Sequence, residues 1–188
     1  MNEKFENWYR IPEEFNQPHS IIGDGRFFIV VDTENNRLVT FKKEKDAFIK
    51  LEEINGFGNR PHFGMFLDNK YYIWDGIDTM YVYEESGNKL VLHKSYFVSS
   101  LSGTYVRSFS YIDEKWYFPT SNGKILVTDT NFEVVSEYTV PNNIAGLSYI
   151  YKVDEYWYVN VFTDINYDTS YASNGVQGAT SGIKKQVV

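Results

Sequence analysis

The sequence predicts an all-β protein made of four sheet-forming repeats, which is the arrangement of a β-propeller with four-stranded antiparallel blades. Three observations lead to this fold class. An acidic turn followed by an aromatic strand recurs four times, Asn- and Gly-containing turns separate short strand-like segments, and no long segment has the apolar spacing of a helix. The turns begin at Asp24, Asp68, Asp113 and Asp154, at spacings of 44, 45 and 41 residues, in or near the range of propeller blades, roughly 40 to 50 residues.

The second repeat shows how each unit is built. A strand over residues 62–67 leads into the Asp68 turn, and further strands are expected over residues 71–74, 80–83 and 90–97. The residues between these strands are Asn, Gly, Asp and Ser, which suit tight turns. In the third repeat, strands are expected over residues 125–127 and 132–140, the last with the alternation of a half-exposed outer strand.

The two ends of the chain are predicted to complement one another. The segment 5–12 aligns with the outer strand of the third repeat, whereas the fourth repeat has strands from residue 146, over 156–162 and over 182–188 but no fourth strand. Pairing segment 5–12 with the last blade removes exposed sheet edges. We therefore expect one domain over residues 1–188, with blades at about 19–52, 62–97, 106–140 and 146–188. The alternatives are a fragment of a larger propeller and an open array that closes by association.

Composition excludes several classes of function. The 188-residue chain has 18 Lys and Arg against 25 Asp and Glu, a net charge of −7 and a pI near 5.0, with no basic patch of the kind that nucleic-acid binding needs. No Cys is present, which excludes disulfides, thiolate zinc sites and cysteine nucleophiles. The chain as given has no secretory signal and no apolar stretch of membrane-spanning length, so we predict no membrane insertion and make no prediction of compartment.

Segments of the chain resemble known propeller families. Residues 18–28 (PHSIIGDGRFF) and 60–68 (RPHFGMFLD) resemble the opening of NHL-type and related six-bladed repeats, with Pro, apolar positions, an acidic turn and an aromatic residue. Residues 154–161 (DEYWYVNV) are similar to a blade of glutamine-cyclotransferase-like propellers. The resemblance covers about residues 15–165 and consists of repeat signatures, so it implies a fold and no particular activity. Four repeats also depart from the six that those families imply.

Four residues are expected at corresponding places in the four blades. His19, His62, Arg107 and Ser148 each lie five or six residues before the acidic turn of their repeat. Because propellers place ligands where their first strands converge, we expect these side chains to face a shared funnel, with Tyr105 and Tyr149 beside them. Imidazoles and a guanidinium suit an anionic group, and His19 and His62 can also bind a divalent metal. The alternative is that each His caps a strand.

A second candidate lies in the long loop of the fourth repeat. Asp164, Asn166 and Asp168 have the alternating oxygen ligands that suit a hard cation such as calcium. The loop lacks the Gly and the terminal Glu of an EF-hand, so a solvated polar loop is the alternative. No cofactor is predicted apart from a metal at one of these two places.

Aromatic and acidic residues form a third group of candidates. Exposed Tyr and Trp would suit sugar or peptide binding, but Tyr71, Trp74, Trp116 and Trp157 fall inside strands, where packing between blades is the expected role. The carboxylates that follow second strands, Asp32 among them, are candidates for acid–base chemistry or ordinary turn residues. No standard catalytic motif is present.

Two functions follow from these patterns. The first is a non-enzymatic binding or scaffold protein that presents the propeller face to a small ligand or a protein partner. The second is a lyase, hydrolase or cyclotransferase that uses a metal or anion site in the same funnel. A phage or surface structural subunit and an oligomeric assembly are also compatible with the sequence.

Overall fold

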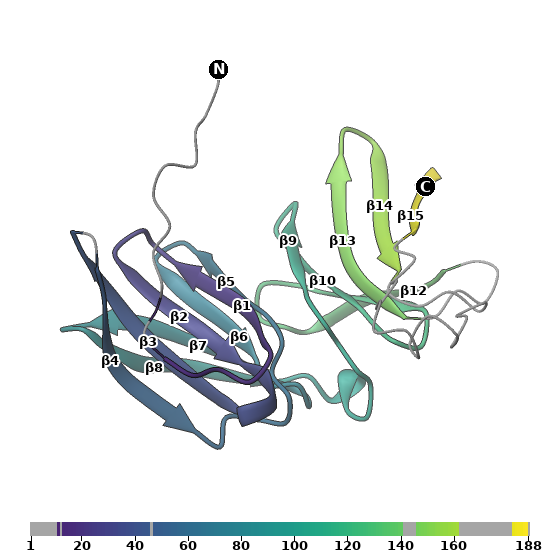
Figure 1. Ribbon diagram of the computed structural model, residues 1–188. Coiled ribbons are helices and arrows are strands. Elements are labelled where there is room, and N and C mark those ends of the chain that lie inside the picture. The colour runs from purple at the N-terminus through teal and green to yellow at the C-terminus, as the bar shows by residue number, and fades with distance from the viewer. Residues whose placement is uncertain (1–10, 12, 46, 141–145, 162–181, 188) are drawn as a thin grey trace, which may run out of the picture. The chain divides into compact units, whose positions relative to one another are not determined.

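The computed structural model describes residue 11 and residues 13–45, 47–140, 146–161 and 182–187. Its strands form four sheets (Figure 1). Within each sheet, strands that follow one another in the chain lie side by side, which is the strand order of propeller blades. Three sheets have four strands, and the fourth has three among the described residues. In sheet order the strands are β1 (Pro18–Gly23), β2 (Phe27–Asp32), β3 (Arg37–Glu44) and β4 (Ala47–Asn55); β5 (Gly64–Leu67), β6 (Lys70–Trp74), β7 (Thr79–Ser86) and β8 (Lys89–Phe97); β9 (Ser110–Ile112), β10 (Lys115–Pro119), β11 (Lys124–Thr128) and β12 (Val134–Thr139); and β13 (Leu147–Val153), β14 (Tyr156–Val161) and β15 (Gly182–Val187).

The recurring acidic turn is the first hairpin turn of every sheet. It joins β1 to β2, β5 to β6, β9 to β10 and β13 to β14. Asp68, Asp113 and Asp154 have left-handed backbones with φ of 50°, 49° and 53°, a conformation that Asp tolerates better than most residues. At the first turn, Asp24 Oδ1 accepts the backbone N–H of Arg26 at 2.8 Å and of Phe27 at 2.7 Å. The sequence signature is therefore a turn signature.

Strand boundaries differ slightly from those expected. The predicted strands at 71–74, 80–83 and 90–97 are confirmed as parts of β6, β7 and β8. β5 begins at Gly64 instead of residue 62, since Gly64 opposite Ile73 is the first pair of its ladder. β12 begins at Val134 instead of residue 132, because Phe132 has a φ of 64° and lies in a turn closed by Asp129.

The chain forms two compact units, residues 1–75 with 81–95 and residues 76–80 with 96–188. In the first unit, the facing sides of the first two sheets bury Ile29, Leu38 and Ile73 completely. The opposite side of the first sheet holds a smaller cluster around Val39 and Phe41, as the alternation of side chains along a strand requires.

The second unit has its own core between the third and fourth sheets. Val127, Leu147 and Ile150 are buried there. Ser108 Oγ donates a hydrogen bond to the carbonyl of Ser148, and Ser110 Oγ donates to the carbonyl of Ile150 at 2.5 Å. These bonds hold the first strands of two successive sheets against each other.

Several predictions concern parts of the chain outside the described residues. The strand over residues 5–12 lies there apart from Ile11, and so does its pairing with the last blade. The predicted closure, the single domain and its blade limits therefore stay predictions. Within the described residues, no helix is long and apolar enough to cross a membrane.

Candidate functional site

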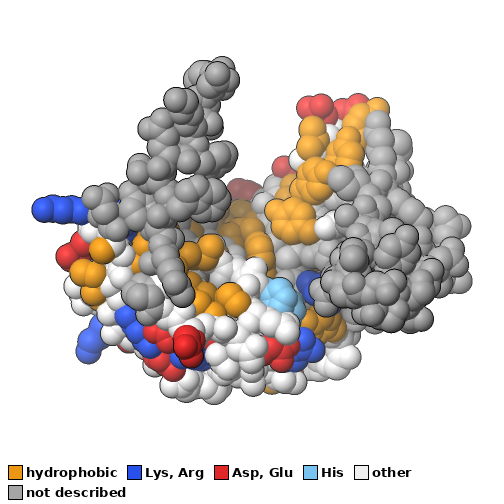
Figure 2. All heavy atoms as spheres, viewed as in Figure 1, with side chains coloured by type: hydrophobic (Ala, Val, Ile, Leu, Met, Phe, Trp, Pro, Cys, Tyr) orange, Lys and Arg blue, Asp and Glu red, His pale blue; other side chains and the backbone are white. Residues whose placement is uncertain are grey.

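The first unit brings two of the predicted site residues into contact. The rings of His19, in β1, and His62, just before β5, are stacked with centroids 4.2 Å apart and planes 14° from parallel. His62 is buried, with 4% of its surface exposed, whereas His19 is exposed. The space-filling view shows histidine at the surface of the molecule in pale blue (Figure 2).

Hydrogen bonds fix the tautomer of both rings. Thr33 Oγ1 donates to the carbonyl of Pro61 at 2.7 Å, so it accepts from His19 Nδ1, which lies 2.8 Å away. His62 Nδ1 lies 2.8 Å from the carbonyl of Arg60 and must also donate. In the neutral ring the lone pair is then on Nε2, which is the nitrogen that could bind a metal.

The predicted correspondence of positions has a structural counterpart in the strand registers. The β1–β2 register slips between Pro18 and Ser20, and the β13–β14 register slips between Leu147 and Tyr149. His19 and Ser148 are thus the extra residues of two equivalent bulges, and bulges redirect the side chains beside them.

The other predicted residues belong to the second unit and have local contacts. Arg107 lies 5.2 Å from the centre of the Tyr105 ring. Ser148 Oγ lies 3.4 Å from the carbonyl of Asn160. Tyr149 is 36% exposed and lies beside Tyr151. A funnel shared by all these residues stays a prediction.

The metal predictions are not tested either. Asp164, Asn166 and Asp168 lie outside the described residues. Among the residues that are described, no three or more His, Asp and Glu side chains are grouped as metal ligands. A metal held by His19 and His62 would therefore need ligands from elsewhere.

Asp32 has a structural role, as expected of a turn residue. It is fully buried, and its carboxylate accepts from the backbone N–H of Asn16 at 2.7 Å, from Asn35 Nδ2 at 2.7 Å and from Arg37 Nε at 2.6 Å. Arg37 also donates to Glu53 at 2.9 Å. A buried carboxylate with this many donors holds the loop ends of the first sheet together.

The second unit contains a hollow that sequence reasoning missed. It has a volume of about 320 Å³ and lies between the third and fourth sheets. We call it the aromatic hollow. Its side-chain walls are formed by Tyr117, Ile125, Tyr138 and Val140 from the third sheet and by Ile150, Trp157 and Val159 from the fourth.

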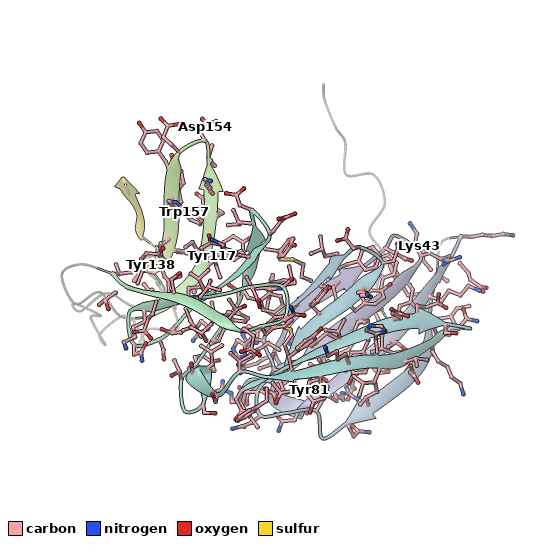
Figure 3. The ribbon with its side chains drawn as sticks, turned by 180° about the vertical axis from the view of Figure 1, so that it is seen from behind. Lys43, Tyr81, Tyr117, Tyr138, Asp154 and Trp157 are labelled. Atoms are coloured by element: carbon pink, nitrogen blue, oxygen red, sulfur yellow. The ribbon has the colours of Figure 1, made fainter. Side chains whose placement is uncertain are left out.

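Strand registers explain why these side chains face one another. Ile125 lies opposite Tyr138, and Tyr117 lies opposite Val127, so the alternation along β10, β11 and β12 puts the tyrosines on one side of the sheet. The Tyr117 and Trp157 rings meet with centroids 4.8 Å apart. Figure 3 shows Tyr117, Tyr138 and Trp157 gathered at this place.

The hollow offers polar groups as well as rings. Burial raises the pKa of Tyr117, and the nearby carboxylate of Asp113 adds to the effect, so its phenol stays neutral and can donate or accept a hydrogen bond. Lys152 Nζ lies 5.5 Å from the centre of the Trp157 ring and pairs with Asp113 at 2.5 Å. Strand alternation predicts from the sequence that these tyrosines lie on one side of their sheet. It does not predict whether other side chains fill the space between the third and fourth sheets.

Comparison with known proteins identifies the fold. No protein-family model and no curated protein matches the chain. A Bacteroides fragilis protein provisionally named a 6-phosphogluconolactonase matches with a TM-score of 0.65 at 12% identity, over 91% of this chain and 57% of that one. The WD40 domain of Neurospora crassa Pan2 matches with a TM-score of 0.56 at 15% identity, over 81% and 48%. The chain has a β-propeller fold.

The predicted propeller fold is thus confirmed, with about four blades. Myxococcus xanthus glutaminyl cyclase also matches, with a TM-score of 0.50 at 13% identity, over 74% of this chain and 66% of the cyclase. This propeller chain spans just over half the length of the Bacteroides protein. At such identities the likeness concerns the fold, which hosts enzymes and binding proteins alike.

Proposed function

We propose that this propeller is a non-enzymatic binding protein that takes a small ligand, or a side chain of a protein partner, into the aromatic hollow. The observation that carries the proposal is the meeting of Tyr117 and Trp157 beside an open volume of about 320 Å³. Ligand pockets combine apolar walls with a few polar groups. This volume is at the lower end of their range, roughly 300 to 1,000 Å³, and suits one ring or one side chain.

The chemistry of the walls favours binding over catalysis. The carboxylate-bearing residue at the hollow is Glu137, whose side chain alternates to the other side of β12 and pairs with Lys124 at 2.7 Å. The side chains that the described residues direct into the hollow are therefore phenols, an indole and aliphatic groups, without the imidazole or carboxylate that most often transfers protons.

Fragments that mimic side chains test this function. Indole and p-cresol should bind to the full chain saturably, as followed by changes in Trp fluorescence and by two-dimensional NMR of the hollow. Val140→Trp should abolish this binding by filling the hollow. Val135→Trp is the matched control, since Val135 lies in β12, the strand that Val140 directly follows, is 50% exposed and does not line the hollow. Equal binding to both variants would refute the proposal.

The alternative is a lyase, hydrolase or cyclotransferase with a metal or anion at the histidine pair. It is supported by the stacked imidazoles of His19 and His62, whose Nδ1 atoms both donate hydrogen bonds, so that the lone pair of each neutral ring is on Nε2. Titration with Zn²⁺ or Mn²⁺, followed by calorimetry, tests it. Saturable binding that His19→Ala removes would favour the enzyme, and no binding by the unmodified chain would count against the metal.

A further inference from the structure

β12 is an outer strand, and no strand of the described part of the chain pairs with its far edge. It pairs with β11 alone and stands at the end of the third sheet. The N–H of Val140 donates to the carbonyl of Gly123 at 2.9 Å, and the ladder continues with Tyr138 opposite Ile125. Backbone direction alternates along an antiparallel strand, so Tyr138 and Val140 point their N–H and C=O groups toward β11.

Glu137 and Thr139 therefore direct their backbone groups away from the sheet. Their pairs, Glu137 with Leu126 and Thr139 with Lys124, are the non-hydrogen-bonded pairs of this ladder. Within the described residues, no backbone bond is made to either residue on that side. An edge of this kind is a template for another strand.

The open edge and the aromatic hollow adjoin each other. Glu137, Tyr138, Thr139 and Val140 all line the hollow, although the side chains of Glu137 and Thr139 lie on the opposite side of the sheet from Tyr138. Glu137 and Thr139 thus border the hollow through their backbone, and Tyr138 and Val140 through their side chains. A ligand that pairs with the edge therefore lies beside the hollow.

We infer that an extended peptide segment of a partner protein adds to the edge of β12 and inserts one apolar side chain into the aromatic hollow. This inference rests on the proposed function and names its partner. Strand addition supplies affinity through main-chain hydrogen bonds, and a pocket for alternate side chains supplies specificity. The outward N–H and C=O of Glu137 and Thr139 match the spacing of such a strand.

The apolar walls of the hollow select the inserted side chain. A Lys or Arg of the partner would lose its water there, and the nearest charges, those of Lys152 and Asp113, already pair with each other at 2.5 Å. A carboxylate would lose its water against the apolar walls of Ile125, Ile150 and Val159. Aromatic or branched aliphatic side chains avoid both penalties.

Peptides with altered backbones test the inference on the full chain. The probes are acetylated and amidated seven-residue peptides of Thr with Trp, Leu or Lys at the centre. We expect the Trp and Leu peptides to bind more tightly than free indole and the Lys peptide to bind least. N-methylation of one set of alternate amides should weaken binding about tenfold or more, and methylation of the other set should change it little, since one face of the peptide pairs with β12.

A protein variant provides the matching test. Thr139→Pro removes an N–H that points away from the sheet, which edge strands tolerate, so it should lower peptide affinity about tenfold. Thr139→Ala is the control and should bind peptide like the parent chain. Tight peptide binding that responds equally to both methylation patterns would overturn the inference.

The two proposals fail in different ways. Binding of indole without stronger binding of any peptide would overturn strand addition and leave the binding function in place. Absence of binding by fragments and peptides alike would overturn both. Binding of peptides to Val140→Trp with unchanged affinity would show that the hollow takes no side chain and would also overturn the inference.

Discussion

The buried His62 ring makes two contacts, a hydrogen bond and a ring stack. It donates to the carbonyl of Arg60 at 2.8 Å and stacks on His19. These contacts fix the chain where it enters β5, which agrees with a strand cap, and the lone pair that a ligand-binding role would use is on Nε2 of the neutral ring. Mutation separates the two roles, since a cap affects stability and a ligand-binding group affects function.

We expect His62→Ala to lower the free energy of unfolding by about 1 to 3 kcal/mol, the sum of one hydrogen bond and one ring pair. Chemical denaturation monitored by fluorescence measures it. His93→Ala is the control, because His93 is exposed and pairs with the exposed Glu84, and should change stability by less than about 0.5 kcal/mol. Equal effects of the two variants would contradict a structural role for His62.

The ion-pair cluster of the first sheet predicts a pH dependence. Lys50 first, and then Arg37, holds the pKa of Glu53 down, from 4.5 to about 2. The Glu53 carboxyl is a stronger acid in the folded chain than in the unfolded chain. Its ion pairs with Lys50 and Arg37 therefore stabilise the fold above about pH 4.5 and lose their effect as the pH falls toward 2. Melting temperatures measured from pH 6 to 2 should fall less steeply for Glu53→Gln than for the parent chain. Parallel curves would contradict this linkage.

At the scale of single elements, the turns were easier to predict from the sequence than the strand ends. The four acidic turns could be predicted because Asp followed within three residues by aromatic strand residues is a local sequence pattern. In three of the turns the Asp itself has a positive φ, and in the first turn Gly25 does. The start of β12 was misplaced by two residues, since the left-handed Phe132 and its turn around Asp129 depend on hydrogen bonds that alternation does not reveal.

Two glycines allow the stability cost of backbone strain to be distinguished from the cost of steric crowding. Gly58 and Gly87 have φ of 64° and 60°, but a Cβ on Gly58 would lie 1.9 Å from the carbonyl oxygen of Asp75, whereas nothing lies within 4 Å at Gly87. We expect Gly87→Ala to cost about 1 to 2 kcal/mol of stability for the left-handed conformation alone. Gly58→Ala should cost roughly 1 to 3 kcal/mol more, as measured by denaturation. Equal costs would mean that the loop at Gly58 yields easily.

At the scale of the whole molecule, the predicted closure of the last blade by residues 5–12 is open to a direct test. We expect the full chain to be a monomer of about 22.0 kDa in light scattering and the chain without residues 1–14 to associate. The deletion would expose a sheet edge and remove the Glu13 carboxylate and the Glu14 carbonyl from Arg37.

A deletion of residues 1–4 is the control and should leave the mass unchanged. An oligomer formed by the full chain, or a 1–14 deletion that remains monomeric, would contradict closure by this segment. The first result would place the chain in a larger assembly.

The sequence by itself determined the repeat, the turn positions and the all-β fold, because hairpin turns and strand alternation are local properties that each residue expresses with its near neighbours. It also aligned His19 with His62, whose contact the structure shows. Only the tertiary structure decided that Tyr117 and Trp157 border an open hollow and that Glu137 and Thr139 direct backbone groups beside it with which no described strand pairs. These features join residues from different sheets, and the volume left between two packed sheets depends on how all their side chains fill it.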